Sequence, residues 1–421
     1  MDFFEFLNTA VTPYHTVDAL KSFFKANSFT EIELGANLEP AKAYFVCREA
    51  SIIAFRTPQK WSDESKFKIA LAHTDFPTLK ISPNPDGMNA GVCTLHTEVY
   101  GSPLYTSWLD RDLGYAGMLA YVDSADKSNT LKTKLFRGDK LFRIPQLAVH
   151  LNRGVNQDGL KVNPQIDFNA LWACASDSKA SENRKNLFVK ALEKELPEGS
   201  RLIDFDVQLF DAQSANRGGF NDEWIYSGRL DNLSSCHAIA EAIVGAKPAE
   251  NDCLVACFFN NEEVGSTTRE GAAGNFLKCV LDSLTSPLSS LASRLSSSIA
   301  LSIDMAHAEH PNHTEKHEPN HAPLLGKGVV LKTNSQKRYA SDLMSSAQLR
   351  LLCEHAGIPL QVFIMRNDMP CGSTVGPTVS ASLGIPTVDI GEPMLSMHSI
   401  REMMAANDHA DMIKLVETLY R

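Results

Sequence analysis

Several apolar runs in this chain end abruptly in a histidine or a carboxylate. The runs, each with the residues that follow it, are 67–72 before His73-Thr74-Asp75, 254–259 before Asn260-Asn261-Glu262-Glu263, and 298–303 before Asp304. Continuous apolar runs of this length, bounded by turn residues, are typical of buried strands. Groups that follow the carboxyl ends of parallel strands lie at the same edge of an open sheet. We therefore expect these side chains to converge, together with Asp231 after residues 228–230 and His398 after residues 393–397.

The hydrophobic pattern also predicts the order of the elements. Apolar residues recur at helical spacing in 3–7, 17–24, 233–244, 283–298, 341–356 and 408–420. Apolar runs predict strands at 44–55, 67–72, 253–259, 298–303, 360–364 and 386–390. Strands that alternate with helices are typical of βαβ units and of a largely parallel sheet.

A central region has a different texture. From about Pro83, prolines and glycines separate short alternating stretches such as residues 93–100, which indicates closely spaced strands and turns. Alternation of strands and helices resumes after the loop-like residues 216–219. We predict an α/β protein with a central, mostly parallel sheet flanked by helices. A smaller β-rich domain, residues 85–218, would be inserted between the two parts of a catalytic domain, 1–84 and 219–421, and would form subunit contacts.

Composition and charge narrow the class of protein. The chain has 421 residues and a formal net charge of −10 without a basic stripe, so we expect no nucleic-acid partner. Acidic residues stand near the start, where a secretory signal needs positive charge, and no apolar run is long enough to span a bilayer. Nine dispersed cysteines without a C-x-x-C pair suit reduced thiols better than a disulfide framework. We expect a cytoplasmic protein with no membrane partner.

The residues expected at the sheet edge form a set of metal ligands. The set is His73, Asp231, Glu263, Asp304 and His398. Two imidazoles and three carboxylates suit zinc, or cobalt or manganese in its place, and a carboxylate shared between two ions is typical of dinuclear hydrolases. Asp75 is placed to accept the proton on the second ring nitrogen of His73, and Glu262 to take a proton from the attacking water. The alternative is that Glu262 and Glu263 only begin a solvated helix.

Other candidate residues have ordinary alternatives. A histidine-rich tract follows Asp304, but two prolines interrupt it and exclude one continuous helical face. We expect His307 and His321 in this tract to form hydrogen bonds and line the substrate site, with metal ligation as the alternative. Cys371, before Gly372 and Ser373, could be a nucleophile, although packing is the usual role of such a thiol.

Six motifs resemble those of the aspartyl aminopeptidase family of dinuclear zinc exopeptidases. They are Ala72-His73-Thr74-Asp75, Arg229-Leu230-Asp231-Asn232, Asn261-Glu262-Glu263-Val264-Gly265-Ser266, Ile303-Asp304-Met305-Ala306-His307 with Lys316-His317-Glu318, Asp368-Met369-Pro370-Cys371-Gly372-Ser373-Thr374, and Met397-His398-Ser399-Ile400-Arg401-Glu402. They occur in the order of the family and cover nearly the whole chain. The resemblance implies one zinc on His73, Asp231 and Asp304 and another on Asp231, Glu263 and His398. It also implies that Asp231 bridges the metals and that Glu262 is the general base.

The resemblance further implies two divalent metal ions per subunit, peptide substrates with amino-terminal Asp or Glu, and a homo-oligomer of twelve subunits. A family lysine like Lys332 contacts the substrate carboxylate, although the alternating pattern around this residue would ordinarily place it in solvent. The motif with Cys371, Gly372 and Ser373 implies substrate contacts. His150 matches a position that reaches the active site of a neighbouring subunit, and the alternatives are a core histidine on a strand or a zinc ligand.

The expected activity is therefore hydrolysis of the amino-terminal residue of peptides. Two other classes stay open at this point. One is a catalytically silent oligomeric shell or cargo-binding protein, against which the intact Glu262 argues. The other is a related metal-dependent deacylase or carboxypeptidase, which a comparison of peptide and N-acyl substrates would separate.

Overall fold

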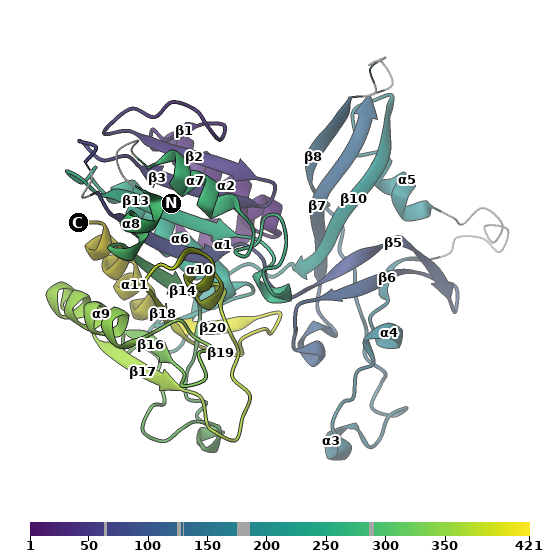
Figure 1. The fold of residues 1–421 in the computed structure, drawn as a ribbon. Coiled ribbons are helices and arrows are strands. Elements are labelled where there is room, and N and C mark those ends of the chain that lie inside the picture. The colour runs from purple at the N-terminus through teal and green to yellow at the C-terminus, as the bar shows by residue number, and fades with distance from the viewer. Residues whose placement is uncertain (63–64, 124–127, 129, 175–185, 286–289) are drawn as a thin grey trace. The chain divides into compact units, whose positions relative to one another are not determined.

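The chain forms two compact units. A computed structural model describes residues 1–62, 65–123, 128, 130–174, 186–285 and 290–421. The first unit comprises Met1–Phe76, Ala215–Met397 and Glu402–Arg421, and the second comprises Pro77–Ser214 with His398–Arg401 (Figure 1). No helix of the described residues is long and apolar enough to cross a membrane.

A large mixed sheet forms the centre of the first unit. In the described part of the chain its strands stand in the order β1 (Thr30–Glu31), β2 (Ala43–Arg48), β3 (Ser51–Arg56), β13 (Cys253–Phe259), β4 (Phe67–His73), β14 (Ile299–Ile303), β18 (Thr387–Gly391), β16 (Val329–Thr333) and β17 (Leu360–Ile364). The four central strands β13, β4, β14 and β18 are parallel to one another, so their carboxyl ends share one edge. The strands β3 and β16 beside them are antiparallel. The prediction of an α/β fold with a mostly parallel central sheet is confirmed.

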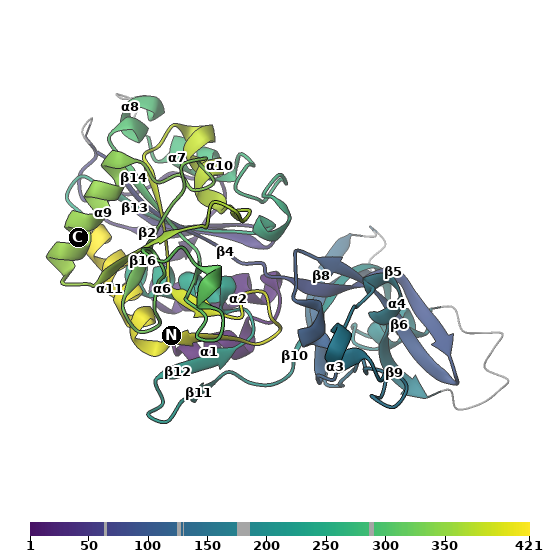
Figure 2. The same cartoon turned by 90° about the horizontal axis from the view of Figure 1, so that it is seen from below.

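Helices cover both faces of this sheet (Figure 2). On one face lie α1 (Phe3–Thr9), α2 (Pro13–Ala26), α6 (Leu230–Gly245), α9 (Leu343–Ala356) and α11 (Ala406–Tyr420). On the other lie α7 (Phe276–Ser283), α8 (Leu291–Ser296) and α10 (Val375–Leu383). Alternate residues of β13 pack into the two apolar clusters, Leu254 and Phe258 into one and Val255 and Phe259 into the other. A strand buried on both faces must be apolar at every position, which is why its sequence is a continuous apolar run.

A second sheet of short strands completes the first unit. Its described strands stand in the order β11 (Asn216–Gly218), β12 (Trp224–Ser227), β20 (Glu402–Ala405), β19 (Pro393–Leu395) and β15 (Ala306–His307). The sequence predicted a loop at 216–219, and this prediction is wrong for β11, which pairs antiparallel with β12. Strands of two to four residues carry too little periodicity to be recognised, because the partner strand defines them.

The second unit is an antiparallel, β-rich structure. Its described strands stand in the order β8 (Leu131–Arg137), β7 (Leu113–Asp123), β10 (Ser200–Asp211), β5 (Thr78–Asn89), β6 (Val92–Tyr100) and β9 (Ala170–Cys174). The short α-helices described beside them are α3 (Val155–Asp158), α4 (Pro164–Asp167) and α5 (Leu187–Glu193). An apolar cluster around Leu95, Leu119 and Val207 forms the core of this unit.

Two boundaries differ from the sequence expectations. The strand β5 runs through the predicted break at residues 84 and 85, because the register with β6 shifts between Ile81 and Asp86 and so accommodates the prolines. The first break therefore lies between Phe76 and Pro77. The helix predicted over residues 283–298 is not continuous, since α7 ends at Ser283 and the Ser290 side chain caps a new helix, α8. Residues 286–289 lie outside the described residues.

Candidate metal centre

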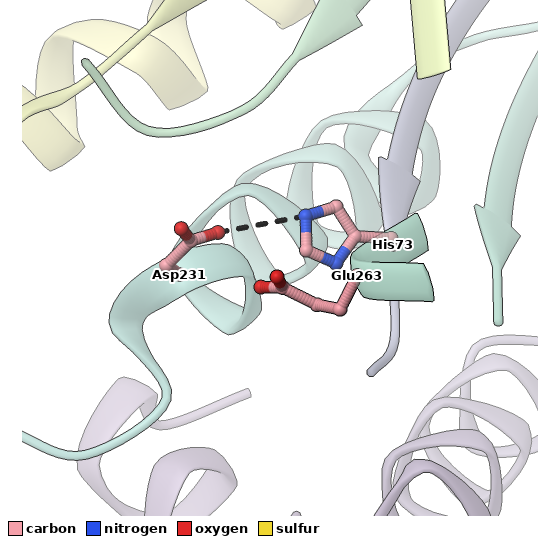
Figure 3. Close-up of side chains that lie close together, drawn as sticks. All are labelled: His73, Asp231 and Glu263. Carbon is pink, nitrogen blue, oxygen red and sulfur yellow. Dashed lines mark ion pairs between the residues drawn. The ribbon is translucent and has the colours of Figure 1, made fainter. Parts of the chain in front are cut away.

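Four of the five predicted ligands come together where β4, β13 and β14 end. His73 is the last residue of β4, and its Nε2 lies 3.5 Å from Oδ1 of Asp231 and 3.6 Å from Oδ1 of Asp304. Ligand atoms of His73, Asp231 and Glu263 all lie within 4.8 Å of one another (Figure 3). Because these side chains come from four separate segments, the sheet and α6 together build the group.

Asp231 is held at an irregular start of α6. Arg229 has a positive φ of 64°, and Asp231 and Asn232 depart from helical geometry. The backbone N–H of Asp231 donates to Oε2 of Glu402 at 3.1 Å, and the Asn232 side chain donates to the carbonyl of Ile303 at 2.9 Å. The second bond ties this start to the strand that precedes Asp304.

The two glutamates lie in a short turn after β13. A 3-10 turn spans Glu262–Val264 between two residues of positive φ, Asn261 and Gly265. Both glutamates are half-buried, so the alternative of a solvated helix start is wrong. The backbone N–H groups of Glu262 and Glu263 donate to the two carboxylate oxygens of Asp75 at 3.0 and 3.1 Å.

Asp75 contacts the site through both its carbonyl and its carboxylate. The Nδ1 of His73 lies 2.9 Å from the Asp75 carbonyl oxygen and 3.5 Å from its carboxylate. The carbonyl can only accept, so Nδ1 donates and leaves Nε2 to face the carboxylates. Asp75 is thus the acceptor that the sequence suggested, through its main-chain carbonyl, while its carboxylate fixes the glutamate turn.

Burial and neighbouring charges perturb the titration of this group. Burial by itself would lower the pKa of His73, but the carboxylates of Asp231, Asp304 and Asp75 raise it well above its usual value. Burial raises the pKa of Glu262 to about 8, and His73 opposes this shift while Asp304 and the other nearby carboxylates add to it. The raised pKa values of His73 and Glu262 favour their protonated forms in this place, where the neighbouring carboxylates concentrate negative charge.

The donor set fits a divalent cation. Two ligands about 2.1 Å from a tetrahedral ion lie roughly 3.4 Å apart, close to the 3.5 and 3.6 Å that separate Nε2 of His73 from the two aspartates. Within the described residues, that buried Nε2 has no hydrogen-bond partner. A cation between these atoms would replace the proton of His73 and neutralise the carboxylates.

Lys332 is a buried residue of this site. Its Nζ donates to the Met305 carbonyl at 3.0 Å, lies 3.4 Å from Oδ2 of Asp304, and sits 5.3 Å from the centre of the Tyr339 ring. Only 2% of the residue is exposed, so the expectation of a solvated strand position is wrong. The ammonium group balances part of the negative charge on Asp304.

The remaining predicted residues lie in several places. His307, in β15, lines a cavity, whereas His321 is bonded to Glu318 at 2.5 Å. The Cys371 carbonyl accepts a hydrogen bond from Arg338, and Ser373 donates to the carbonyl of the same arginine. Gly372 lies between them and is exposed. These contacts do not test Cys371 as a nucleophile, and its role in substrate contact stays a prediction.

Two predicted histidines belong to the second unit. His398 has its Nδ1 3.0 Å from the carbonyl of Ser102, and its own carbonyl accepts from Leu104. Its role as a metal ligand stays a prediction. His150 is exposed in a turn, so the alternative of a core histidine on a strand is wrong.

Sequence reasoning missed two buried carboxylates around the site. Glu402 supports Asp231, and the motif that contains His398 ends at this residue, which was the available signal. Asp389, in β18, accepts from the Thr374 hydroxyl at 2.5 Å and from the Ala340 N–H at 2.6 Å. It thereby anchors the segment that carries Cys371. An acidic residue inside an apolar strand was the available signal in the sequence. Its hydrogen-bond partners could not be predicted, because they come from loops far away in the chain.

Comparison with known proteins places this geometry in context. The model of the family described as aminopeptidase I zinc metalloprotease (M18) matches residues 6–420. The chain is 37% identical over 420 residues to a probable M18 family aminopeptidase 2 of Pseudomonas aeruginosa (strain UCBPP-PA14), covering 99% of this chain and 96% of the relative. It is 35% identical over 461 residues to aspartyl aminopeptidase 4 of Saccharomyces cerevisiae, covering 100% and 94%.

Solved structures show the same similarity. A chain in the cryo-EM structure of the Ape4 and Nbr1 complex superposes with a TM-score of 0.92 and 32% identity over 100% of this chain and 84% of that chain. The S. cerevisiae mApe1 dodecamer gives a TM-score of 0.85 and 26% identity over 99% and 94%.

Proposed function

Because this chain belongs to the aminopeptidase I zinc metalloprotease family, M18, and is a metallo-aminopeptidase, we propose that it removes amino-terminal Asp or Glu from peptides at a two-metal site. The group of His73, Asp231 and Glu263, with ligand atoms within 4.8 Å of one another, carries this proposal. The similarity to a yeast aspartyl aminopeptidase supports the acidic preference.

The ligands divide between two metal positions. His73 and Asp304 would hold one ion, Glu263 and His398 would hold the other, and Asp231 would be shared by both. The short distances from His73 to both aspartates support the first position. The turn that holds Glu263, fixed by Asp75, supports the second.

The reaction needs a group that moves a proton beside the metals. When bound, the ions lower the pKa of a water molecule and polarise the scissile carbonyl. The Glu262 carboxylate accepts a proton from the attacking water and passes it to the nitrogen of the departing peptide. Its backbone N–H is bonded to Asp75, so the turn keeps the carboxylate next to the ligand Glu263.

Recognition of an acidic side chain needs a desolvated cation. Lys332 is buried and supplies one, and the segment Cys371-Gly372-Ser373 adds polar groups for substrate contact. His150 contributes from a neighbouring subunit. The similarity to the mApe1 dodecamer supports an assembly of twelve subunits, with the second unit forming subunit contacts.

A panel of aminoacyl reporter substrates tests this function. Purified protein, first stripped with a chelator and then given zinc, cobalt or manganese, is expected to release the reporter fastest from aspartyl and glutamyl compounds. Elemental analysis of the reconstituted protein is expected to give two ions per subunit. Fast release from leucyl substrates would contradict the acidic preference, and turnover of N-acyl compounds alone would favour a deacylase.

A further inference from the structure

A cavity of about 260 Å³ lies in the first unit next to the segment that follows Asp304. Its walls include His307 of β15, Phe363 of β17 and Met394 of β19. Four of the lining side chains are methionines, those at positions 365, 369, 394 and 397. Neither the candidate metal ligands nor Lys332 line this cavity, so it is a separate feature of the surface.

The segment that follows Asp304 links the cavity wall to the candidate metal centre. The carbonyl of Met305 accepts from Lys332, and Ala306 packs in one apolar cluster with Phe363, a residue of the cavity wall. His307 is three residues after Asp304, and three residues span at most about 10–11 Å. A peptide held at the metals in an extended conformation advances by roughly 3.3–3.6 Å per residue. The second and third residues of such a peptide lie within the same distance of the metals as this wall.

The chemistry of the wall selects an apolar side chain. Thioether side chains are flexible and polarisable, so a methionine-lined wall adapts to apolar groups of different shapes. The rings of Phe363 and His307 add an edge-to-face pair at 5.7 Å. The charged groups at the wall are largely engaged elsewhere, since Arg366 is bonded to Asp368 and Glu318 to His321.

One cation of the cavity wall is not part of these pairs. With Arg366 paired to Asp368 and Glu318 to His321, Lys316 is the remaining charged side chain of the wall. A peptide that ends shortly after its apolar residue would bring its terminal carboxylate to this cation. Charge complementarity thus favours a peptide substrate over an apolar small molecule as the occupant.

We propose that this cavity binds the apolar side chain of the second or third residue of a peptide substrate. The proposal rests on the aminopeptidase function proposed above and adds a preference on the far side of the bond that is cut. It predicts that the enzyme discriminates among peptides that share the same amino-terminal residue.

Two series of short peptides test the cavity. Each begins with the amino-terminal residue that the reporter panel shows to be preferred, and each carries Leu, Phe, Ser or Asn at position two or at position three, with Ala elsewhere. The wild-type enzyme is expected to give a kcat/KM about 10-fold higher for Leu or Phe than for Ser or Asn at one of these positions. The aminoacyl reporter, which has no downstream residues, is measured beside them.

Isosteric variants assign the preference to the cavity. Met369→Gln changes a wall residue that is 40% exposed, so the fold tolerates it, and Met365→Gln is combined with it for a larger effect. The double variant is expected to lower the apolar-to-polar ratio from about 10-fold to less than about 3-fold. Met344→Gln, on the exposed face of α9 and outside the cavity, is the matched control and is expected to keep the wild-type ratio.

Each outcome decides between distinct conclusions. A wild-type enzyme indifferent to the downstream residue would overturn the proposal, as would a ratio that is unchanged in both cavity variants. An equal loss in Met344→Gln would also overturn it, because the effect would then be unspecific. Absence of release from every reporter and peptide would instead refute the proposed aminopeptidase function.

Discussion

The two units of this chain differ in where their buried polar and exposed apolar residues lie. In the first unit, helices bury both faces of the large sheet, and the polar groups His73, Asp75 and Asp231 are buried at places where strands and helices begin or end. Both units expose some large apolar side chains, but several of those in the second unit follow one another within residues 141–151, including Leu151 at 73% exposure. A buried polar group in a covered sheet indicates chemistry, whereas an exposed apolar surface indicates a binding partner. We therefore expect catalysis in the first unit and subunit contacts through the second.

The largest expected effect separates the adjacent glutamates of the first unit. Glu262→Gln is expected to retain both metals and lose kcat by a factor of about 10²–10⁴, because it removes the general base. Glu263→Gln is expected to lose metal instead. Elemental analysis and steady-state kinetics measure the two effects.

A matched change in the second unit tests whether chemistry is confined to the first. Glu98→Gln, at an exposed position of β6, is expected to leave both metal content and kcat unchanged. Equal metal loss in Glu262→Gln and Glu263→Gln would show that the roles of these two residues are assigned wrongly.

Lys332→Met is expected to produce the next largest effect. Removal of a buried cation leaves the substrate carboxylate without a partner and costs roughly 2–5 kcal/mol in transition-state binding of acidic substrates. Cleavage of aspartyl or glutamyl reporters should fall far more than that of leucyl or alanyl ones. Metal affinity should not fall, because Lys332 lies 3.4 Å from Asp304 and its removal leaves more negative charge on this ligand for the cation.

The exposed Lys327→Met is the control for this change and should preserve both properties. If Lys332→Met keeps the acidic-to-neutral ratio of kcat/KM, the lysine serves only Asp304 and does not recognise the substrate.

The exposed apolar residues of the second unit predict an assembly that mutation disrupts. The wild-type chain is expected to sediment as a large symmetric oligomer of twelve subunits at micromolar concentration. Leu147→Asp combined with Leu151→Asp should dissociate it, because each buried leucine contributes about 1.5–3 kcal/mol. Leu343→Asp, equally exposed but in the first unit, should leave the oligomer intact. A wild-type monomer, or dissociation by the control alone, would reverse the assignment of assembly.

The smallest expected effect concerns the acid stability of the first unit. Burial, together with His409, lowers the pKa of His237 to about 3, well under its usual value. Between that pH and about 6.5 the unfolded chain binds a proton that the folded chain does not. The free energy of unfolding therefore decreases by about 1.4 kcal/mol for each unit by which the pH is lowered. Lowering the pH from 6.5 to 5 should therefore cost about 2 kcal/mol from this residue.

Denaturant unfolding of His237→Gln at both pH values isolates that contribution. The variant is less stable at neutral pH, because its bond to His409 at 3.0 Å is altered, but it should lose less stability on acidification than the wild type. His96→Gln, at an exposed position of the second unit, should behave as the wild type does. A parallel acid dependence of His237→Gln and the wild type would exclude His237 as the cause.

Single residues show how far the sequence predicted the site. His73 and Asp304 were predictable because each ends a continuous apolar run, and a strand that is buried on both faces needs such a run. The convergence of these residues also followed, since parallel strands end at one edge. Glu402 and Asp389 were not predicted, because their structural role is to accept hydrogen bonds from backbone N–H groups of segments that are distant in sequence.

The sequence by itself determined the alternation of strands and helices, the strand ends that carry the ligands, and the family, since all of these depend on local periodicity or on motifs that are short in sequence. Only the tertiary structure decided which atom of Asp75 meets His73, that Lys332 is buried against Asp304, and that β5 crosses the expected domain boundary. These features depend on contacts between residues that are far apart in the chain, or on the choice between a carbonyl and a carboxylate a few ångströms away. A linear pattern of apolar and polar positions carries no information about either, because it records which side of an element is buried and not which atoms meet there.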